Sequence, residues 1–178
     1  MKVENLKKLL RSKLTPQIIF EIFFALVAAY RVWACMQNPM ETTDIYRYLG
    51  YGKHAFDHFF GIYEYTPRQI SPTEWATIWP DQKFAYPPYA LYFFSFFSFL
   101  HLGIFWVKLT MTALEGIMGY WVSQNVNRWV GLALWASPIS IWYTSFEGQY
   151  EALQSFLIFL CVIQIQKKNW DWGGFWFL

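Results

Sequence analysis

Charged residues are scarce in this chain, which argues against an ordinary soluble domain. Asp, Glu, Lys and Arg make up 15% of the 178 residues, whereas soluble domains average about a quarter. The net charge at pH 7 is only +2, which argues against a nucleic-acid-binding surface. The few basic residues are therefore informative through their positions along the chain.

Cysteine is almost absent as well. Cys35 and Cys161 are the only two, and both lie in apolar stretches. They provide neither a disulfide framework nor a zinc-ligand spacing, so we expect two small buried side chains. The first apolar run also lacks a small-residue cleavage site, which argues against a cleavable signal peptide.

Apolar residues are abundant instead. Hydrophobic residues make up 56% of the chain and aromatic residues 23%. Because about 20 apolar residues cross a bilayer as a helix, this composition predicts an all-α polytopic membrane protein. The expected transmembrane helices are residues 16–36, 103–122, 129–146 and 150–166, with 172–178 as the start of an incomplete fifth. The chain would then be an N-terminal fragment, or would be completed by a second membrane chain.

Basic residues predict the orientation. Residues 1–15 form a basic arm expected in the cytoplasm, and residues 37–102 are then an outer loop. Residues 88–101 are too short and proline-bordered to span, and their crossing would put Arg128, Lys167 and Lys168 outside. We therefore expect two juxtamembrane helices in the outer loop, at about 44–60 and 88–101, in a multi-pass protein of the plasma membrane or endoplasmic reticulum.

The first polar constellation follows the first span. Asp44, Arg47, His54 and His58 recur at helical spacing, which predicts an amphipathic interfacial helix. Asp44 is either a helix cap or a general base that faces a lipid-borne substrate. His54 and His58 have a spacing that suits a metal, although wet interfacial imidazoles are the favoured interpretation.

Two further constellations lie later in the chain. Lys108 and Glu115 share one predicted membrane helix, where ionisable residues default to a functional hypothesis. Snorkelling of Lys108 and an interhelical hydrogen bond of Glu115 are the alternatives; Glu21 and Arg31 are also expected to snorkel. Glu147, Gln149 and Glu151 cluster at a turn on the outer side, as a binding site or as a solvated polar turn.

Taken in order, these motifs resemble the GT-C superfamily of integral membrane glycosyltransferases. The resemblance covers residues 15–166 and begins with the acidic residue in TTDIYRYLGYGKHAF. It continues through Tyr86-Pro87-Pro88 and the spacing of Lys108 and Glu115. It ends at SPISIWYTSFEGQYEAL, where Ser137 and Glu151 replace the family's Asn and Asp. The family usually has about twice as many spans or more, so the resemblance implies that a C-terminal half, which helps to form the lipid and acceptor sites, is missing here.

The resemblance implies an inverting transfer of a hexosyl unit, such as mannosyl, from a polyprenyl-phosphate donor to a glycan, lipid or protein acceptor. Asp44 would be the base and Lys108 would bind the donor phosphate. A divalent metal such as Mg or Mn, held by Asp44 and Glu151, is a further expectation. The remaining predicted site residues are Glu147, Gln149, Glu151 and Tyr86 for the donor, with Arg47, His54, His58 and Glu115 in support. A non-catalytic assembly partner and a transporter remain the alternatives.

Overall fold

The computed structural model describes residues 16–40, 44–70 and 80–167, and no strand occurs in these ranges. The predicted arm, residues 1–15, and the predicted fifth span, residues 172–178, lie outside the described residues, as does Lys168. In chain order the helices are α2 (Pro16–Met36), α3 (Asp44–His58), η1 (Phe59–Glu64), α4 (Pro67–Ile70), α6 (Pro88–Phe99), α7 (Ile104–Asn125), α8 (Arg128–Trp135), α9 (Pro138–Ser140), η2 (Ile141–Phe146) and α10 (Glu151–Gln166). The all-α expectation is confirmed for this part of the chain.

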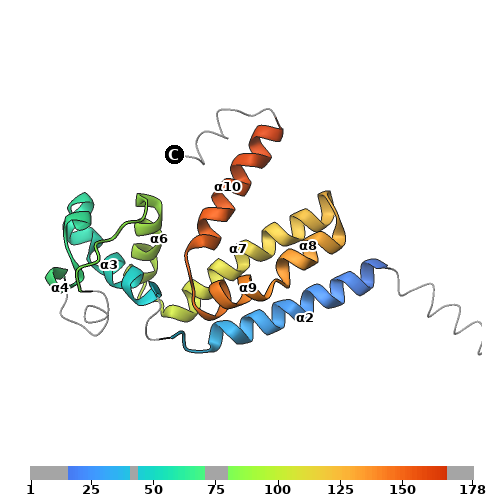
Figure 1. The fold of residues 1–178 in the computed structure, drawn as a ribbon, viewed down its shortest axis with the longest axis horizontal. Helices are drawn as coiled ribbons and strands as arrows, with labels where there is room; N and C mark the ends of the chain where they lie inside the picture. Colours follow the sequence, from blue (N-terminus) through green and yellow to red (C-terminus); the bar gives the residue numbers. More distant parts are fainter. Residues whose placement is uncertain (1–15, 41–43, 71–79, 168–178) are drawn as a thin grey trace, which may run out of the picture.

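The helices form two groups. α2, α7 and α8 lie side by side, and each contacts the other two (Figure 1). α3, α4 and α6 gather at the end of this group where α2 finishes and α7 begins, with α6 across α3 (Figure 1). α10 contacts α7 but leans away from α8, at 118° to the segment before it. The turn before α10 therefore lies at the same end as α3 and α6.

Local sequence explains the boundaries of α6. Pro87 is the N-cap and Pro88 occupies the first turn, where a missing N–H costs nothing. His101 ends the helix with φ of 53°, and the Leu102 N–H donates to the Phe97 carbonyl at 2.9 Å. This left-handed cap satisfies a carbonyl of the last turn and directs the chain into α7. The expected helix at 88–101 is therefore present as Pro88–Phe99.

The expected helix at 129–146 is not continuous. It is divided into α8, α9 and η2, and η2 is a π-helix. Pro138 causes the division because proline lacks an N–H and disfavours helical geometry at the preceding residue. The neighbouring expectations, 103–122 and 150–166, correspond to the unbroken helices α7 and α10.

Among the described helices, α2 alone is long and apolar enough to cross a membrane, judged by length and composition. The bent pair from Arg128 to Phe146 and from Glu151 to Gln166 would add a second if it formed one span. The structure therefore supports one membrane-compatible helix, and the other expected spans stay predictions.

Charged side chains are enclosed while large apolar ones are exposed. Arg31, Arg47 and Lys108 are among the largest fully buried side chains. Phe23 and Leu26, on the outside of α2, are 51% and 60% exposed. The expectation that Arg31 snorkels is wrong, because four groups of neighbouring helices and the turn after α8 surround its guanidinium.

α7 and α8 approach closely where glycine removes a side chain. A Cβ added at Gly131 would lie 2.5 Å from the Ser123 nitrogen and would also collide with the Gly119 carbonyl oxygen. Gly131→Ala is expected to lower the free energy of unfolding by about 1–3 kcal/mol, because these backbone atoms cannot move aside individually. Thermal unfolding in detergent measures this, with Gly61→Ala as the control, since a Cβ at Gly61 meets nothing within 4 Å. Equal melting temperatures for the two variants would contradict the tight crossing.

Candidate functional site

Four of the residues predicted for the site meet around one tyrosine hydroxyl. The Tyr48 hydroxyl lies 3.0 Å from the Tyr86 hydroxyl, 3.4 Å from Asp44 Oδ2 and 3.4 Å from Gln149 Oε1. Arg47 Nη2 donates to the Tyr86 hydroxyl at 3.1 Å and lies 2.9 Å from Asp44 Oδ1. We call Asp44, Arg47, Tyr48, Tyr86 and Gln149 the Tyr48 cluster. Its members come from three segments that are far apart in the sequence.

Helix geometry brings the first three together. Asp44, Arg47 and Tyr48 stand at i, i+3 and i+4 in the first turn of α3, so they share one face. The Tyr48 ring packs against Phe94 of α6 at 4.8 Å and against Tyr86 at 5.0 Å between ring centroids. This aromatic contact holds α6, and the Tyr86 that precedes it, against α3.

Gly52 lets α3 and α6 meet. A Cβ at this position would lie 2.7 Å from the backbone carbon of Phe94, so a larger residue would separate the helices. The residue before Gly52 in α3, Tyr51, holds the chain between α3 and α6. Its hydroxyl donates to the backbone carbonyls of Tyr65 and Gln82. Burial raises the pKa of Tyr51 to about 12, so the phenol remains a donor in neutral solution.

The environment of Tyr48 keeps its hydroxyl protonated. Burial raises the pKa of Tyr48 far above its ordinary value, and the hydrogen bond with Tyr86 and the negative charge of Asp44 add to the rise. Tyr48 is fully buried, whereas the side chain of Asp44 is 25% exposed beside it. The cluster therefore contains one partly exposed carboxylate, that of Asp44, which is held by Arg47 and lies beside the buried ring of Tyr48.

A sharp turn carries Gln149 to the cluster. Gly148 has φ of +70°, and a Cβ there would lie 2.9 Å from Lys108 Cγ and would also collide with Ile45. Glycine is required on both grounds. The next predicted residue along the turn, Glu151, is exposed at the start of α10, and its charge contributes to the raised pKa values of Tyr48 and Tyr150.

Glu147 anchors the turn from the other side. Its side chain is 6% exposed, and its Oε2 accepts the backbone N–H of Met40 at 3.3 Å. Met40 belongs to the segment between α2 and α3. Glu147 therefore joins that segment to the turn. Its buried carboxylate has a structural role and is not accessible to a ligand.

Lys108 occupies a different environment from the one expected. It is fully buried, and its ammonium donates to the carbonyls of Gln37 at 2.7 Å and Ala34 at 3.3 Å. These carbonyls belong to the last turn of α2 and the residue after it, where a helix leaves acceptors unsatisfied and favours a cation. Lys108 thus caps α2 instead of facing a lipid phosphate.

Lys108→Met is expected to lower the free energy of unfolding by about 1–3 kcal/mol, because two buried carbonyls lose their donor. The KM for a phosphorylated donor should change little in the fraction that stays folded. Chemical unfolding and donor titration measure the two effects separately. A stable variant with a raised KM would restore Lys108 as a phosphate ligand.

Glu115 pairs with Arg31. Its Oε2 lies 2.6 Å from Arg31 Nη1 and accepts the Ser140 hydroxyl at 2.6 Å, while Oε1 accepts the Thr144 hydroxyl at 2.9 Å. Arg31 also donates to Ser140 and Ser145 and to the Trp135 carbonyl. We call this set the Arg31 network. It joins α2, α7 and the broken segment α8–η2.

The two predicted histidines lie further along α3. His54 Nδ1 is 4.0 Å from Asp57 Oδ2, and the centroids of the His58 and Tyr65 rings lie 4.6 Å apart with the rings tilted by 38°. Burial lowers the pKa of His54, with a contribution from Lys53. Within the described ranges, no group of three or more His, Cys, Asp or Glu could hold a metal.

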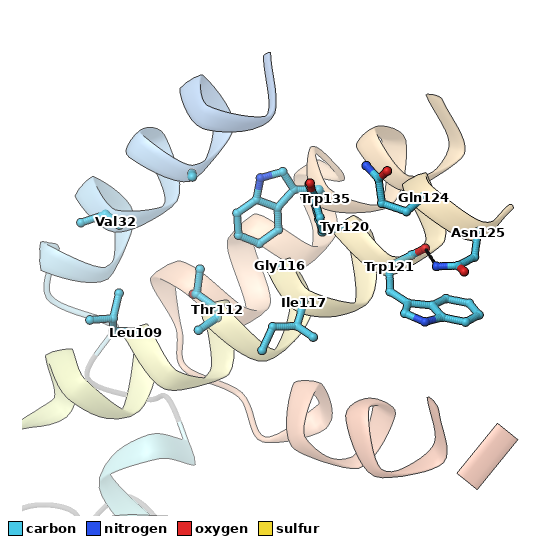
Figure 2. A pocket seen from close by; sticks show the side chains of 12 residues that line it. Val32, Leu109, Thr112, Gly116, Ile117, Tyr120, Trp121, Gln124, Asn125 and Trp135 are labelled. Carbon is cyan, nitrogen blue, oxygen red and sulfur yellow. Dashed lines mark hydrogen bonds between the residues drawn. The ribbon is translucent and has the colours of Figure 1, made fainter. Parts of the chain in front are cut away.

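Several hollows lie on the described helices. An apolar hollow of about 630 Å³ follows α7 between Val32 of α2 and Trp135 of α8, and Asn125 lies at its far end (Figure 2). An aromatic groove of about 520 Å³ lies between α6, α7 and α10. A groove of about 470 Å³ with many polar side chains lies between α9–η2 and α10.

Tyr48 is not among the site residues predicted from the sequence. Its spacing of four from Asp44 could have identified it, because that spacing puts both on one helix face. The central contact partner of the site was therefore missed.

The chain was compared with known proteins, and no protein-family model, curated protein or solved structure matches it. The support for a family is therefore the set of four ordered motifs in the sequence.

Proposed function

We propose that this chain is an integral membrane protein with the Tyr48 cluster on the outer or lumenal side. Large exposed apolar side chains over α2 and α8, such as Leu26 and Leu134, support an environment of lipid. Enclosed charges on Arg31 and Lys108 fit the same arrangement, because a charge facing lipid is costly. The basic residues of the first 15 positions favour a cytoplasmic N-terminus.

Within that arrangement the chain acts as a membrane glycosyltransferase that moves a hexosyl unit from a polyprenyl phosphate to an acceptor, with inversion. One observation carries the proposal: Asp44, Tyr86 and Gln149 meet around Tyr48. These residues belong to three separate motifs of the GT-C resemblance. Their meeting is what a shared site requires, and it supports the proposal.

Asp44 is the group suited to proton transfer. Its carboxylate is partly open and is held by Arg47, so it can accept the proton of an acceptor hydroxyl. The acceptor oxygen then attacks the anomeric carbon, and the bond to the phosphate oxygen breaks with its electron pair on the phosphate. Tyr48, kept protonated by its surroundings, can share its single hydroxyl proton with Asp44 Oδ2 at 3.4 Å and so helps to hold the carboxylate in place.

The leaving phosphate needs positive charge, and the enclosed Lys108 does not supply it. The carboxylates of Asp44 and Glu151 are oxygen donors of the kind that Mg²⁺ uses together with substrate phosphates. With no third such ligand among the described residues, these two would hold a metal only with the donor bound. A metal there would neutralise charge on the leaving phosphate.

The aromatic groove suits the lipid chain of the donor. Phe93 and Phe97 of α6 line it together with Leu153 and Leu157 of α10, and its lining is almost wholly apolar. Phe93 also contacts Phe94, which packs on Tyr48, so the groove adjoins the cluster. An isoprenoid tail in this groove would bring its phosphate towards Asp44.

The test is transfer by the purified full chain in proteoliposomes, with a short polyprenyl phosphate carrying labelled mannose. Label in acceptor, with release of polyprenyl phosphate, is expected above vesicles without protein. Absence of both, alone and with any co-purifying polytopic chain, would contradict the enzyme and favour an assembly partner. Solute flux without transfer would instead support a transporter.

A further inference from the structure

The groove between α9–η2 and α10 places several polar side chains in a lining whose surface is otherwise mostly apolar. Glu115 of α7, Ser137 and Ser140 of the α9 turn, and Ser155 of α10 contribute to a hollow of about 470 Å³. Small-molecule sites commonly have volumes of about 300–1,000 Å³. The groove therefore has the size of a site for a small ligand, and a mostly apolar lining with a few polar side chains is typical of such sites.

The backbone beside the groove is irregular. η2 is a π-helix and follows the break at Pro138. Single π-turns occur often at functional sites. In a membrane, irregular backbone is tolerated where protein buries it or where it lines a water-filled cavity. η2 borders the groove through Tyr143 and Thr144, so its irregularity coincides with the polar side chains of the lining.

Several polar groups of the lining are available to a ligand. Glu115 is engaged by Arg31, Ser140 and Thr144, which fixes the wall of the groove. By contrast, the side chains of Glu151 and Ser155 have no hydrogen-bond partner among the described residues, although both line the groove. These groups offer a carboxylate and a hydroxyl to whatever enters.

The charge of the lining selects the ligand class. None of the described residues that line the groove carries a positive charge, and Glu151 adds a negative one. Arg31 lies behind Ser140 but is fully buried, so it is closed to a ligand. A phosphate without a bound metal is therefore disfavoured here, whereas a neutral polyol can form hydrogen bonds with both hydroxyls and carboxylates.

We propose that this groove binds the uncharged, polyhydroxyl part of a substrate, next to the Tyr48 cluster. Glu151 links the two, since it lines the groove and stands two residues after Gln149, which belongs to the cluster. The inference deepens the proposed glycosyltransferase and rests on it for the identity of the ligand as a sugar. Whether water and a polyol can enter the groove can be tested without any catalytic assay.

Cysteine labelling of the full chain in proteoliposomes tests the proposal. Ser155→Cys faces the groove, and Ile158→Cys, one turn on and 47% exposed, is the matched control outside the lining. Cys35 and Cys161 are buried, so wild type gives the background. A membrane-impermeant thiol reagent is expected to label Ser155→Cys well above Ile158→Cys. Equal labelling would overturn the water-filled groove.

Protection identifies the ligand class. Methyl mannoside at about ten times its Kd is expected to slow labelling of Ser155→Cys about tenfold, by occupancy. Inorganic phosphate at the same concentration should not. Protection by phosphate alone, or by neither probe, would overturn the proposal. Sugar transfer without protection would contradict the groove proposal but not the glycosyltransferase proposal. Protection without sugar transfer would contradict the glycosyltransferase proposal but not the binding of a polyol in the groove.

Discussion

Arg31→Met is expected to lower the free energy of unfolding by about 3–5 kcal/mol, because it leaves the Glu115 carboxylate without its cation inside the helix group. Arg31 is fully buried and donates to Glu115 at 2.6 Å and to the Trp135 carbonyl at 2.9 Å. Its Cζ also lies 4.2 Å from the centroid of the Trp135 ring. Urea or detergent unfolding followed by tryptophan fluorescence measures the change.

A double-mutant cycle separates the ion pair from packing. Arg31→Met with Glu115→Leu should recover part of the loss, because both charges are then removed together. Arg128→Met is the control: Arg128 is partly exposed at the start of α8, and surface changes usually stay within about 0.5 kcal/mol. If Arg31→Met behaved like Arg128→Met, the Arg31 network would not hold the helices together.

The Arg31 network shows where sequence reasoning stops. Arg31 stands near the end of an apolar run, and snorkelling is the least costly local solution there. Its partners are 84 to 114 residues away and lie on other helices and on the turn that follows α8. Nothing local in the sequence specifies that encounter. The same limit applies to Lys108, whose carbonyl partners lie 71 and 74 residues earlier.

The outer constellation was more predictable because its geometry is local or follows from a single rule. The spacing of Asp44 and Arg47 sets them on one face of a helix that the sequence indicates by itself. The prediction that Asp44 and Arg47 lie near Gln149 followed from keeping residues 88–101 out of the membrane. That topology places the start of the outer loop and the turn at Gln149 on the same side of the membrane. In the structure, Asp44 Oδ2 and Gln149 Oε1 each lie 3.4 Å from the Tyr48 hydroxyl at that end. Which side of a bilayer this end faces stays a prediction.

Asp44→Asn is expected to lower kcat for sugar transfer by about 10²–10⁴-fold, the usual contribution of a general base. Asn has nearly the same shape as Asp and caps a helix start about as well, so α3 should form normally. The KM for the polyprenyl-phosphate donor should change little, because the lost interaction acts on the acceptor proton. Steady-state transfer in proteoliposomes, with a melting temperature for each variant, measures both.

The matched control for this change is Asp57→Asn. Asp57 lies on the same helix, its side chain is 73% exposed, and its ion partner His54 is 4.0 Å away. The substitution alters net charge identically but leaves the Tyr48 cluster untouched, so kcat should stay near wild type. If Asp44→Asn kept wild-type kcat, its carboxylate would be only a helix cap and a partner of Arg47. A loss of kcat at unchanged melting temperature, seen at Asp44 and not at Asp57, separates catalysis from folding because both variants lose one carboxylate from α3.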